Sequence, residues 1–129
     1  MGEKDKKETE KKSTGNKGEN LACIFLESKE YSIVEKNFRA AKCEIDIIAK
    51  KDEYIIFIEV KTRKSQKFGS ASQSVGFGKQ KNIIKAAEMF LTMNDLYMDL
   101  QPRFDVIEVY MDDKTGRNYI NHIEFAFIT

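Results

Sequence analysis

Two short segments of the sequence carry carboxylates and a lysine at a spacing that suits metal or phosphate chemistry. They are Glu44-Ile45-Asp46 and Glu59-Val60-Lys61. Residues two apart in a β-strand point to the same face, so each segment presents its two charges together. The polar residues 50–53 between the two β-rich stretches predict a hairpin that brings the segments side by side.

A turn centred between residues 52 and 53 places Asp46 opposite Glu59 and Glu44 opposite Lys61. Opposed Cβ atoms lie about 4.5–5.5 Å apart, and two carboxylates at about 5 Å repel by roughly 3 kcal/mol at an effective dielectric constant near 20. Two explanations for such a pair stay open. Lys61 could neutralise Glu44 or Glu59 in ordinary ion pairs, or Asp46 and Glu59 could hold Mg²⁺ or Mn²⁺, with Lys61 beside them to orient or deprotonate a water. The apolar residues around the charges predict strands covered on both faces, which favours the metal site.

Two further polar residues are candidates for the same site. Glu19 shares a helical face with Ala22 and Leu26 and so points toward the core, but Asn16 three residues earlier also fits a capping box that would explain Glu19 by helix capping alone. Gln80 lies on the apolar stripe of a second helix, where it could hold a water or a phosphate, or be an ordinary amide near a helix start.

The charge is close to balanced overall but unevenly distributed. The 129 residues carry 22 Lys and Arg against 21 Asp and Glu, a net charge of +1. Residues 60–87 nevertheless hold seven basic residues and no acid, whereas residues 88–113 hold seven acids and one arginine. A basic segment that follows a carboxylate–lysine strand suits a phosphodiester backbone, although a solvated basic loop without a ligand is the alternative.

Several other classes of protein are excluded. A single histidine, His122, cannot support a histidine-rich metal site or a serine–histidine–aspartate relay. Cys23 and Cys43 are too few and too widely spaced for a disulfide framework, so we expect reduced thiols and a cytoplasmic protein. No apolar stretch is long enough for a membrane span, so we expect no membrane partner.

The pattern of apolar residues predicts one α/β domain, a mixed β-sheet flanked by helices in the order αβββαββ. Residues 1–17 lack aliphatic side chains after Met1 and are predicted to be a disordered charged tail, and residues 18–129 a single domain. Residues 62–78 are predicted to be a long loop. The predicted helices are 16–29 and 79–93, and the predicted strands are 31–38, 43–49, 54–61, 104–111 and 118–127.

An ordered set of short motifs resembles a known family. They are Gly18-Glu19, Asn37, Arg39, Glu44-Ile45-Asp46, Phe57-Ile58-Glu59-Val60-Lys61-Thr62-Arg63, Phe68-Gly69, Lys79-Gln80 and Arg103-Phe104-Asp105-Val106. The set is similar to the YraN-like bacterial proteins of the restriction-endonuclease-like superfamily, the PD-(D/E)xK nucleases, and to archaeal Holliday-junction resolvases. The sequence departs from the family at Cys43, where a glycine is usual before Glu-Ile-Asp.

The resemblance implies a restriction-endonuclease-like fold and phosphodiester hydrolysis of DNA or RNA. Asp46 and Glu59 correspond to metal ligands, Lys61 to the catalytic lysine, Glu19 to the acid of the first helix in resolvase-like members, and Gln80 to a polar residue on the helix after the hairpin. By analogy with resolvases, a homodimer is also compatible with the resemblance.

Together these features predict a Mg²⁺- or Mn²⁺-dependent endonuclease that acts on structured DNA, including branched junctions. Glu19 would support the metal directly or through water, and Arg39, Arg63, Lys64, Lys67 and Lys79 would hold backbone phosphates. The first alternative is a nucleic-acid-binding protein that keeps the fold without catalysis. The second is an interaction protein that uses the aromatic segment from Tyr119 to Phe127.

Overall fold

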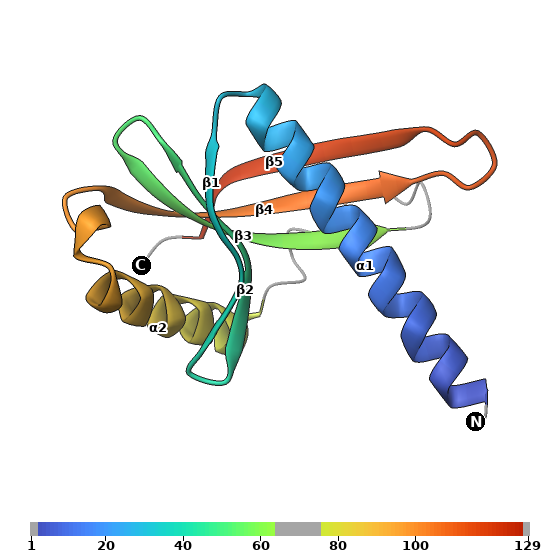
Figure 1. Cartoon of the computed structure of the whole chain (residues 1–129), viewed down its shortest axis with the longest axis horizontal. Helices are drawn as coiled ribbons and strands as arrows, with labels where there is room; N and C mark the ends of the chain where they lie inside the picture. The colour runs from blue at the N-terminus through green and yellow to red at the C-terminus, as the bar shows by residue number, and fades with distance from the viewer. Residues whose placement is uncertain (1–2, 64–75, 128–129) are drawn as a thin grey trace.

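The computed structural model of the chain describes residues 3–63 and 76–127, with side chains from residue 16 onward. The predicted order αβββαββ is confirmed, with a short 3₁₀ helix, η2, before β4 (Figure 1). The elements are α1 (Glu3–Ser28), β1 (Ser32–Ala40), β2 (Cys43–Lys51), β3 (Tyr54–Arg63), α2 (Phe77–Met93), η2 (Asp95–Tyr97), β4 (Gln101–Met111) and β5 (Asn118–Phe127).

The five strands form one mixed sheet in the order β1-β2-β3-β4-β5. The pairs β1–β2, β2–β3 and β4–β5 are antiparallel, and β3–β4 is parallel. Parallel neighbours need a crossover connection, and α2 lies within the connection from β3 to β4. The carboxylate–lysine strand β3 is therefore the centre of the sheet.

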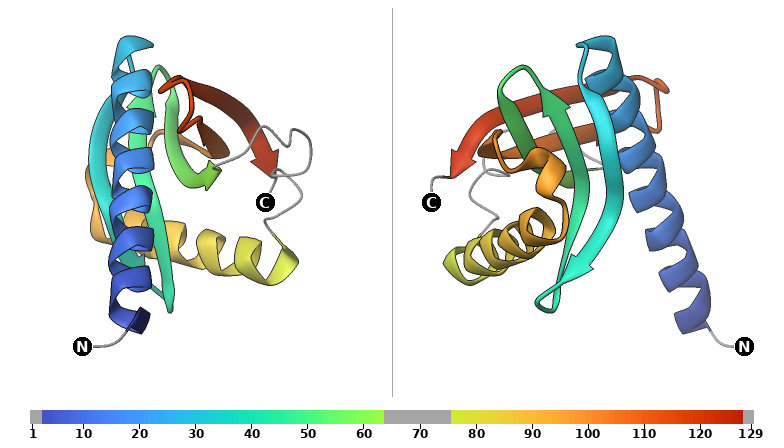
Figure 2. Two further views of the ribbon diagram at one scale, coloured as in Figure 1. Left: turned by 90° about the vertical axis from the view of Figure 1, so that its right-hand side faces the viewer. Right: turned by 60° about the vertical axis from the view of Figure 1, so that its left-hand side comes forward.

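The two helices cover opposite faces of the sheet (Figure 2). On one face, Ala22, Cys23 and Leu26 of α1 pack with buried residues that include Ile47 and Ile58. On the other face, residues of α2 pack with a second cluster that lies around Phe57 and Phe104. The central strands are thus buried on both faces, which is why they read as nearly continuous apolar runs.

Helix α1 begins earlier than the sequence predicts. It starts at Glu3 rather than near Asn16, so the segment predicted to be a disordered tail is helical from Glu3 onward. Its N-terminal half extends beyond the sheet (Figure 1). Lysine and glutamate have good helix propensity, and adding residues to an existing helix avoids a new nucleation step.

A glycine sets the distance between α1 and the end of β3. Gly18 is buried, and a Cβ atom at this position would overlap Oγ1 of Thr62. Only a residue without a side chain lets the helix backbone approach this strand so closely. The contact fixes the neighbouring residue, Glu19, near the end of β3.

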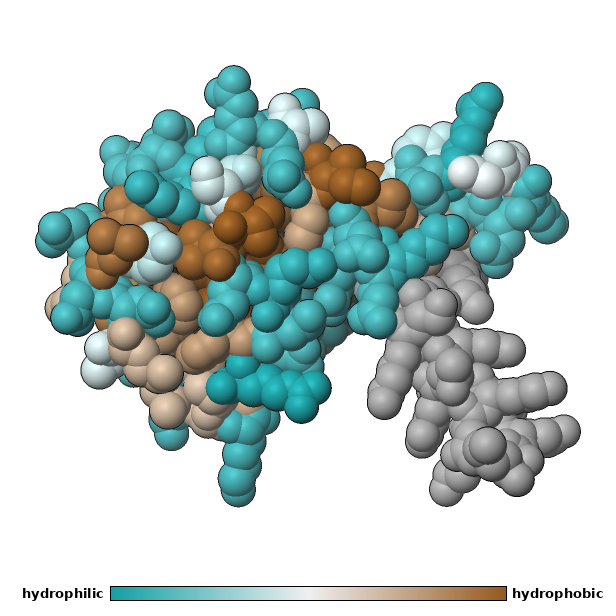
Figure 3. Space-filling view, in the orientation of Figure 1, coloured by the Kyte–Doolittle hydropathy of each residue, from teal (hydrophilic) through white to brown (hydrophobic). Residues whose placement is uncertain are grey.

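On the face shown in Figure 3, hydrophilic side chains surround separate hydrophobic patches. The large apolar side chains that are exposed include Met93, Leu96 and Met98, which lie near the end of α2 and in or beside η2. Within the described part of the chain, neither helix has a stretch that is long and apolar enough to span a bilayer.

Candidate functional site

Strands β2 and β3 pair in the predicted register and then separate. The register is confirmed for five pairs, from Lys51–Tyr54 to Ile47–Ile58. Beyond Ile58 the ladder stops, and the side chain of Asp46 accepts a hydrogen bond from the backbone N–H of Val60 at 2.8 Å. The predicted direct pairing of Asp46 with Glu59 is therefore wrong, because the Asp46 carboxylate replaces a backbone partner at the point of separation.

Glu44 faces β1 rather than β3. Its Cα pairs with that of Arg39, and its carboxylate lies 3.6 Å from the Arg39 guanidinium. The predicted pairing of Glu44 with Lys61 is wrong because β2 follows β1 away from β3 here. Ile45 packs on the α2 face, whereas Ile47 packs on the α1 face, although regular alternation would place both on one face.

Glu59 is buried and is contacted by two ammonium groups. Nζ of Lys79 lies 2.5 Å from Glu59 Oε1, and Nζ of Lys61 lies 3.6 Å from the same oxygen. Lys61 projects from the same strand two residues later, as predicted, whereas Lys79 reaches over from the first turn of α2. Burial and the neighbouring Lys79 ammonium lower the pKa of Lys61. Burial alone would also lower the pKa of Lys79, but its hydrogen bond to Glu59 raises that pKa above its ordinary value.

Asp46 has no cation as a close partner among the described residues. Burial and the nearby carboxylate of Glu59 raise the pKa of Asp46 to about 8, against a smaller opposing effect of the Val60 hydrogen bond. The two predicted metal ligands, Asp46 and Glu59, therefore lie close enough to repel each other. Lysines in the described part of the chain form ion pairs with Glu59 but not with Asp46. Such a perturbed carboxylate beside a charged partner is typical of a functional site.

Glu19 reaches the edge of the same site through Asn37. With its amide nitrogen facing the carboxylates, Asn37 donates to Glu19 Oε2 at 3.2 Å and to Glu44 Oε1 at 2.8 Å. Asn37 adopts a φ of 54°, in the left-handed region that asparagine tolerates. Burial and the Glu44 carboxylate raise the pKa of Glu19. Because α1 continues to Glu3, Glu19 lies inside the helix, and its explanation as part of a capping box is wrong.

A pocket of about 430 Å³ opens beside these groups. Three residues predicted for the site line it, namely Asp46, Glu59 and Lys79. The other lining residues are Lys42, Cys43, Glu44 and Asn82. The sequence offered a signal for Asn82, since it lies three residues after Lys79 on the same helical face, and for Cys43, where the resemblance breaks down.

The remaining predicted residues lie around or outside this pocket. Gln80 is on the first turn of α2, where its backbone N–H donates to the carbonyl of Gly76 at 2.9 Å, and it is not a lining residue. Arg39 is highly exposed at the end of β1, and Arg63 is the last residue of β3. Lys64 and Lys67 lie outside the described residues.

The described residues contain no group of three or more histidine, cysteine, aspartate or glutamate side chains arranged to hold a metal ion. The candidate ligand set in residues 16–63 and 76–127 is therefore the pair Asp46 and Glu59, which line the pocket, whereas Glu19 accepts a hydrogen bond from Asn37. Two carboxylates suit Mg²⁺, which keeps several waters and is commonly bound through one or two carboxylates plus substrate phosphates.

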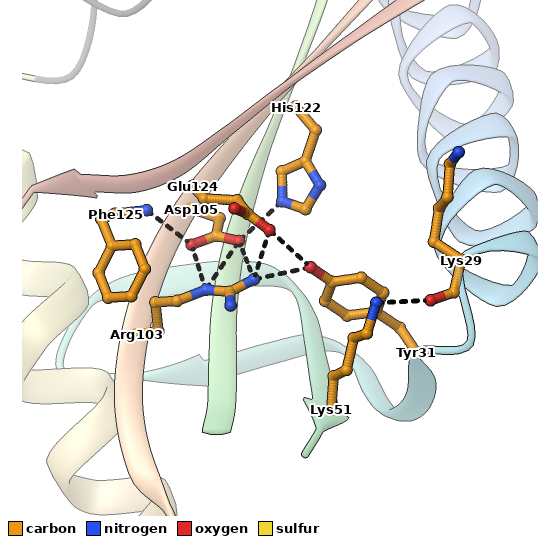
Figure 4. Close-up of polar contacts among 8 residues, drawn as sticks. All are labelled: Lys29, Tyr31, Lys51, Arg103, Asp105, His122, Glu124 and Phe125. Carbon is orange, nitrogen blue, oxygen red and sulfur yellow. Dashed lines mark hydrogen bonds and ion pairs between the residues drawn. The ribbon is translucent and has the colours of Figure 1, made fainter. Parts of the chain in front are cut away.

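A second polar cluster, which sequence reasoning missed, joins the start of β1 to β4 and β5 (Figure 4). Both Nε and Nη2 of the buried Arg103 donate to the Asp105 carboxylate, and Nη2 also donates to the hydroxyl of Tyr31 at 2.8 Å. His122 Nε2 lies 2.7 Å from Asp105 Oδ2, and the backbone N–H of Phe125 donates to Oδ1. Burial alone would raise the pKa of Asp105, but the hydrogen bonds from His122 and Arg103 hold it below its usual range.

This second cluster stabilises an irregularity between the last two strands. The β4–β5 register shifts between Phe104 and Val106, and Phe125 has a φ of 52°. Asp105 lies at the shift, where its carboxylate accepts the N–H of Phe125. Residue Phe125 is 53% exposed and Tyr119 is 52% exposed, so the C-terminal aromatic segment is not fully buried and its role in interactions stays a prediction.

The fold and the site together define a protein with a five-stranded mixed sheet, one helix on each face, and a carboxylate–lysine pocket where two strands separate. Residues 18–109 match the family described as "Uncharacterised protein family UPF0102". The chain therefore belongs to the UPF0102 family, the YraN-like proteins that the motifs resembled.

Relatives in this family match nearly the whole chain. A UPF0102 protein of Caldicellulosiruptor bescii is 49% identical over 90% of this chain and 98% of its own length. One of Caldanaerobacter subterraneus is 43% identical over 94% of this chain and 99% of its own, and one of Clostridium perfringens 47% identical over 90% and 94%. The names of these relatives state no activity.

Proposed function

We propose that this protein is a Mg²⁺- or Mn²⁺-dependent endonuclease that hydrolyses phosphodiester bonds of structured DNA, including branched junctions. One observation carries the proposal: two neighbouring carboxylates, Asp46 and Glu59, line a pocket where β2 and β3 separate, and Lys61 lies beside them. The resemblance to the PD-(D/E)xK nucleases and the archaeal resolvases supports the same assignment, because it gives these three residues the roles of ligands and catalytic lysine.

The donors in the pocket fit a hard divalent cation. Asp46 and Glu59 supply carboxylate oxygens, and water and a substrate phosphate would complete the shell. When bound, the cation would neutralise charge on the phosphate and lower the pKa of a bound water. Glu19 is hydrogen-bonded to Asn37, so it would support the site through water rather than as a direct ligand.

Lys61 would act on the attacking water or the phosphate. Its side chain is only 21% exposed, and its Nζ lies 3.6 Å from Glu59 Oε1, at the side of the ligand pair. An ammonium held there would orient a water by donating hydrogen bonds to it, and would stabilise negative charge that develops on the phosphate oxygens. Gln80, on the first turn of α2, would add an amide near the same end of the sheet.

Phosphates on either side of the scissile bond would contact the basic residues near the pocket. Arg39 is the second-last residue of β1, Arg63 is the last residue of β3, and Lys79 lies on the pocket wall. Lys64 and Lys67 belong to the same basic stretch of sequence and complete the proposed set. These contacts would position the duplex without reading its sequence, which suits recognition of a DNA structure.

The alternative is a nucleic-acid-binding protein without catalysis, and one observation favours it. Lys61 and Lys79 both contact Glu59, so this carboxylate is already neutralised by the protein itself. On this alternative the carboxylates and lysines form a structural ion-pair network. It predicts salt-sensitive binding of nucleic acid and no metal-dependent cleavage.

Cleavage assays distinguish these functions. Branched, flapped and linear DNA, with RNA of matched sequence, would be incubated with Mg²⁺, Mn²⁺ or EDTA. We expect metal-dependent cleavage that falls by about 10²-fold or more in Asp46→Asn and Lys61→Ala. Asp52→Asn makes the same chemical change at the far end of the hairpin and should leave the rate within about twofold.

Activity that is unchanged in both Asp46→Asn and Lys61→Ala would contradict the proposal. Binding that weakens with salt, without cleavage under any metal condition, would support the alternative function. The Asp52→Asn protein serves as the control for loss of one carboxylate, and loss of activity in Asp46→Asn after the same purification excludes a contaminating nuclease.

A further inference from the structure

Lys79 holds a position that a metal ion would need. Its ammonium lies 2.5 Å from Glu59 Oε1, nearer than the ammonium of Lys61 at 3.6 Å. Glu59 lines the pocket together with Asp46 and Lys79. Within the described residues, the shortest contact between a cation and either carboxylate, Asp46 or Glu59, is thus made by the ammonium of Lys79.

We infer that Lys79 is an internal cation that occupies the metal-binding oxygen of Glu59 and must leave before a divalent metal binds. This inference rests on the proposed function, since it concerns the same two ligands. A metal on Oε1 would lie at about 2.0–2.1 Å, if it were Mg²⁺. An ammonium could not stay on that oxygen without close contact and repulsion between two cations.

The two lysines differ in their freedom to leave. The Lys61 side chain is 21% exposed and belongs to the same strand as Glu59, whereas the Lys79 side chain is 41% exposed and starts from the first turn of α2. A lysine with a long flexible stem and access to solvent can withdraw with little loss of packing. The exchangeable cation is therefore Lys79, and Lys61 stays beside the ligands.

The exchange gives Lys79 two successive contacts. Without metal it neutralises Glu59 and keeps the carboxylate pair stable in the pocket. With metal bound, the released ammonium is on the pocket wall, where a substrate phosphate would be its natural partner. Metal binding and phosphate binding would then favour each other through one side chain.

Titration with Mn²⁺ tests the exchange without relying on activity. Mn²⁺ affinity of the full chain would be measured by calorimetry or by electron paramagnetic resonance for the wild type, Asp46→Asn, Lys79→Gln, Lys79→Arg and Lys42→Gln. Lys42 lines the same pocket but makes no ion pair with a described residue, so Lys42→Gln is the matched loss of one charge.

We expect Lys79→Gln to bind Mn²⁺ about fivefold more tightly than the wild type, which corresponds to the loss of one partly exposed ion pair. Lys42→Gln should change the affinity less than twofold, and Lys79→Arg should not increase it, because arginine keeps the contact with Glu59. Thermal unfolding of each variant shows that the comparison is made on folded protein.

Equal affinities of Lys79→Gln and Lys42→Gln would overturn the exchange while leaving the proposed metal site intact, since the metal would then use a different oxygen. Mn²⁺ binding that is absent in the wild type and in Lys79→Gln, or unchanged in Asp46→Asn, would overturn the metal site itself and the proposed function with it.

Discussion

Replacement of Gly18 by alanine tests how α1 is positioned on the sheet. In an isolated helix the change stabilises by about 1 kcal/mol. Here the new Cβ would overlap Oγ1 of Thr62, so Thr62 or the helix must move. Overpacking of this kind costs about 1–3 kcal/mol. The sum predicts that Gly18→Ala destabilises the protein by about 1 kcal/mol, or about 4 °C in Tm.

The effect of Gly18→Ala on stability should change sign when Thr62 is replaced by alanine. In a Thr62→Ala background the hydroxyl is gone, and the nearest remaining atom is Cβ of residue 62, at 3.3 Å. Gly18→Ala should then stabilise by up to about 1 kcal/mol. Urea unfolding of the four proteins gives the coupling energy of the pair, which we expect to be about 1–3 kcal/mol. A coupling near zero would refute the close approach of α1 to β3 and, with it, the placement of Glu19.

Two further predictions concern the polar cluster and the core. The pKa of Asp105 in the folded protein lies below its ordinary value of 3.8. The ionised carboxylate therefore stabilises the fold fully above about pH 4, and this contribution is lost as the pH falls through the pKa of the folded state. The stability gap between wild type and Asp105→Asn, measured by urea unfolding, should therefore narrow below about pH 4, and a gap that is constant from pH 3 to 7 would contradict this. Phe90→Ala should destabilise by about 3–5 kcal/mol, because Phe90 is buried against the rings of Phe38 and Phe57. Phe77→Ala, at an 83% exposed position, should stay within about 0.5 kcal/mol, and equal losses would contradict the packing of α2.

The sequence predicted the elements and their order because its local signals agree with the fold. Apolar β-rich runs gave the strands, and the polar turn at residues 52–53 gave the register from Lys51–Tyr54 to Ile47–Ile58. The start of α1 was wrong because a charged segment with good helix propensity and no apolar stripe resembles a disordered one.

The sequence predicted which residues lie at the site better than it predicted the contacts between them. Asp46 and Glu59 do lie at one pocket, and Lys61 lies beside Glu59. Their pairing was wrong because the extrapolated register assumed that a regular ladder continues, whereas the side chain of Asp46 takes the N–H of Val60. A side chain that replaces a backbone partner leaves no periodic signal in the sequence.

Contacts between distant elements could not be read from local patterns. Lys79 was assigned to phosphate binding from its basic surroundings, and its contact with Glu59 depends on how α2 packs over β3. The link from Asp105 to His122 likewise joins β4 to β5 beside a shift in their register, and the link from Tyr31 to Arg103 joins the residue before β1 to β4. Such contacts are set by tertiary packing, which the spacing of residues along the chain does not predict.

The central claim is that Asp46 and Glu59 hold a divalent cation in the pocket between β2 and β3. Anomalous diffraction from crystals grown with Mn²⁺ tests it most directly, because the measurement locates the ion itself. We predict one strong peak within bonding distance of both carboxylates, with the Lys79 ammonium displaced from Glu59. A pocket without a peak, in which Lys79 remains on Glu59 at saturating Mn²⁺, would contradict the account.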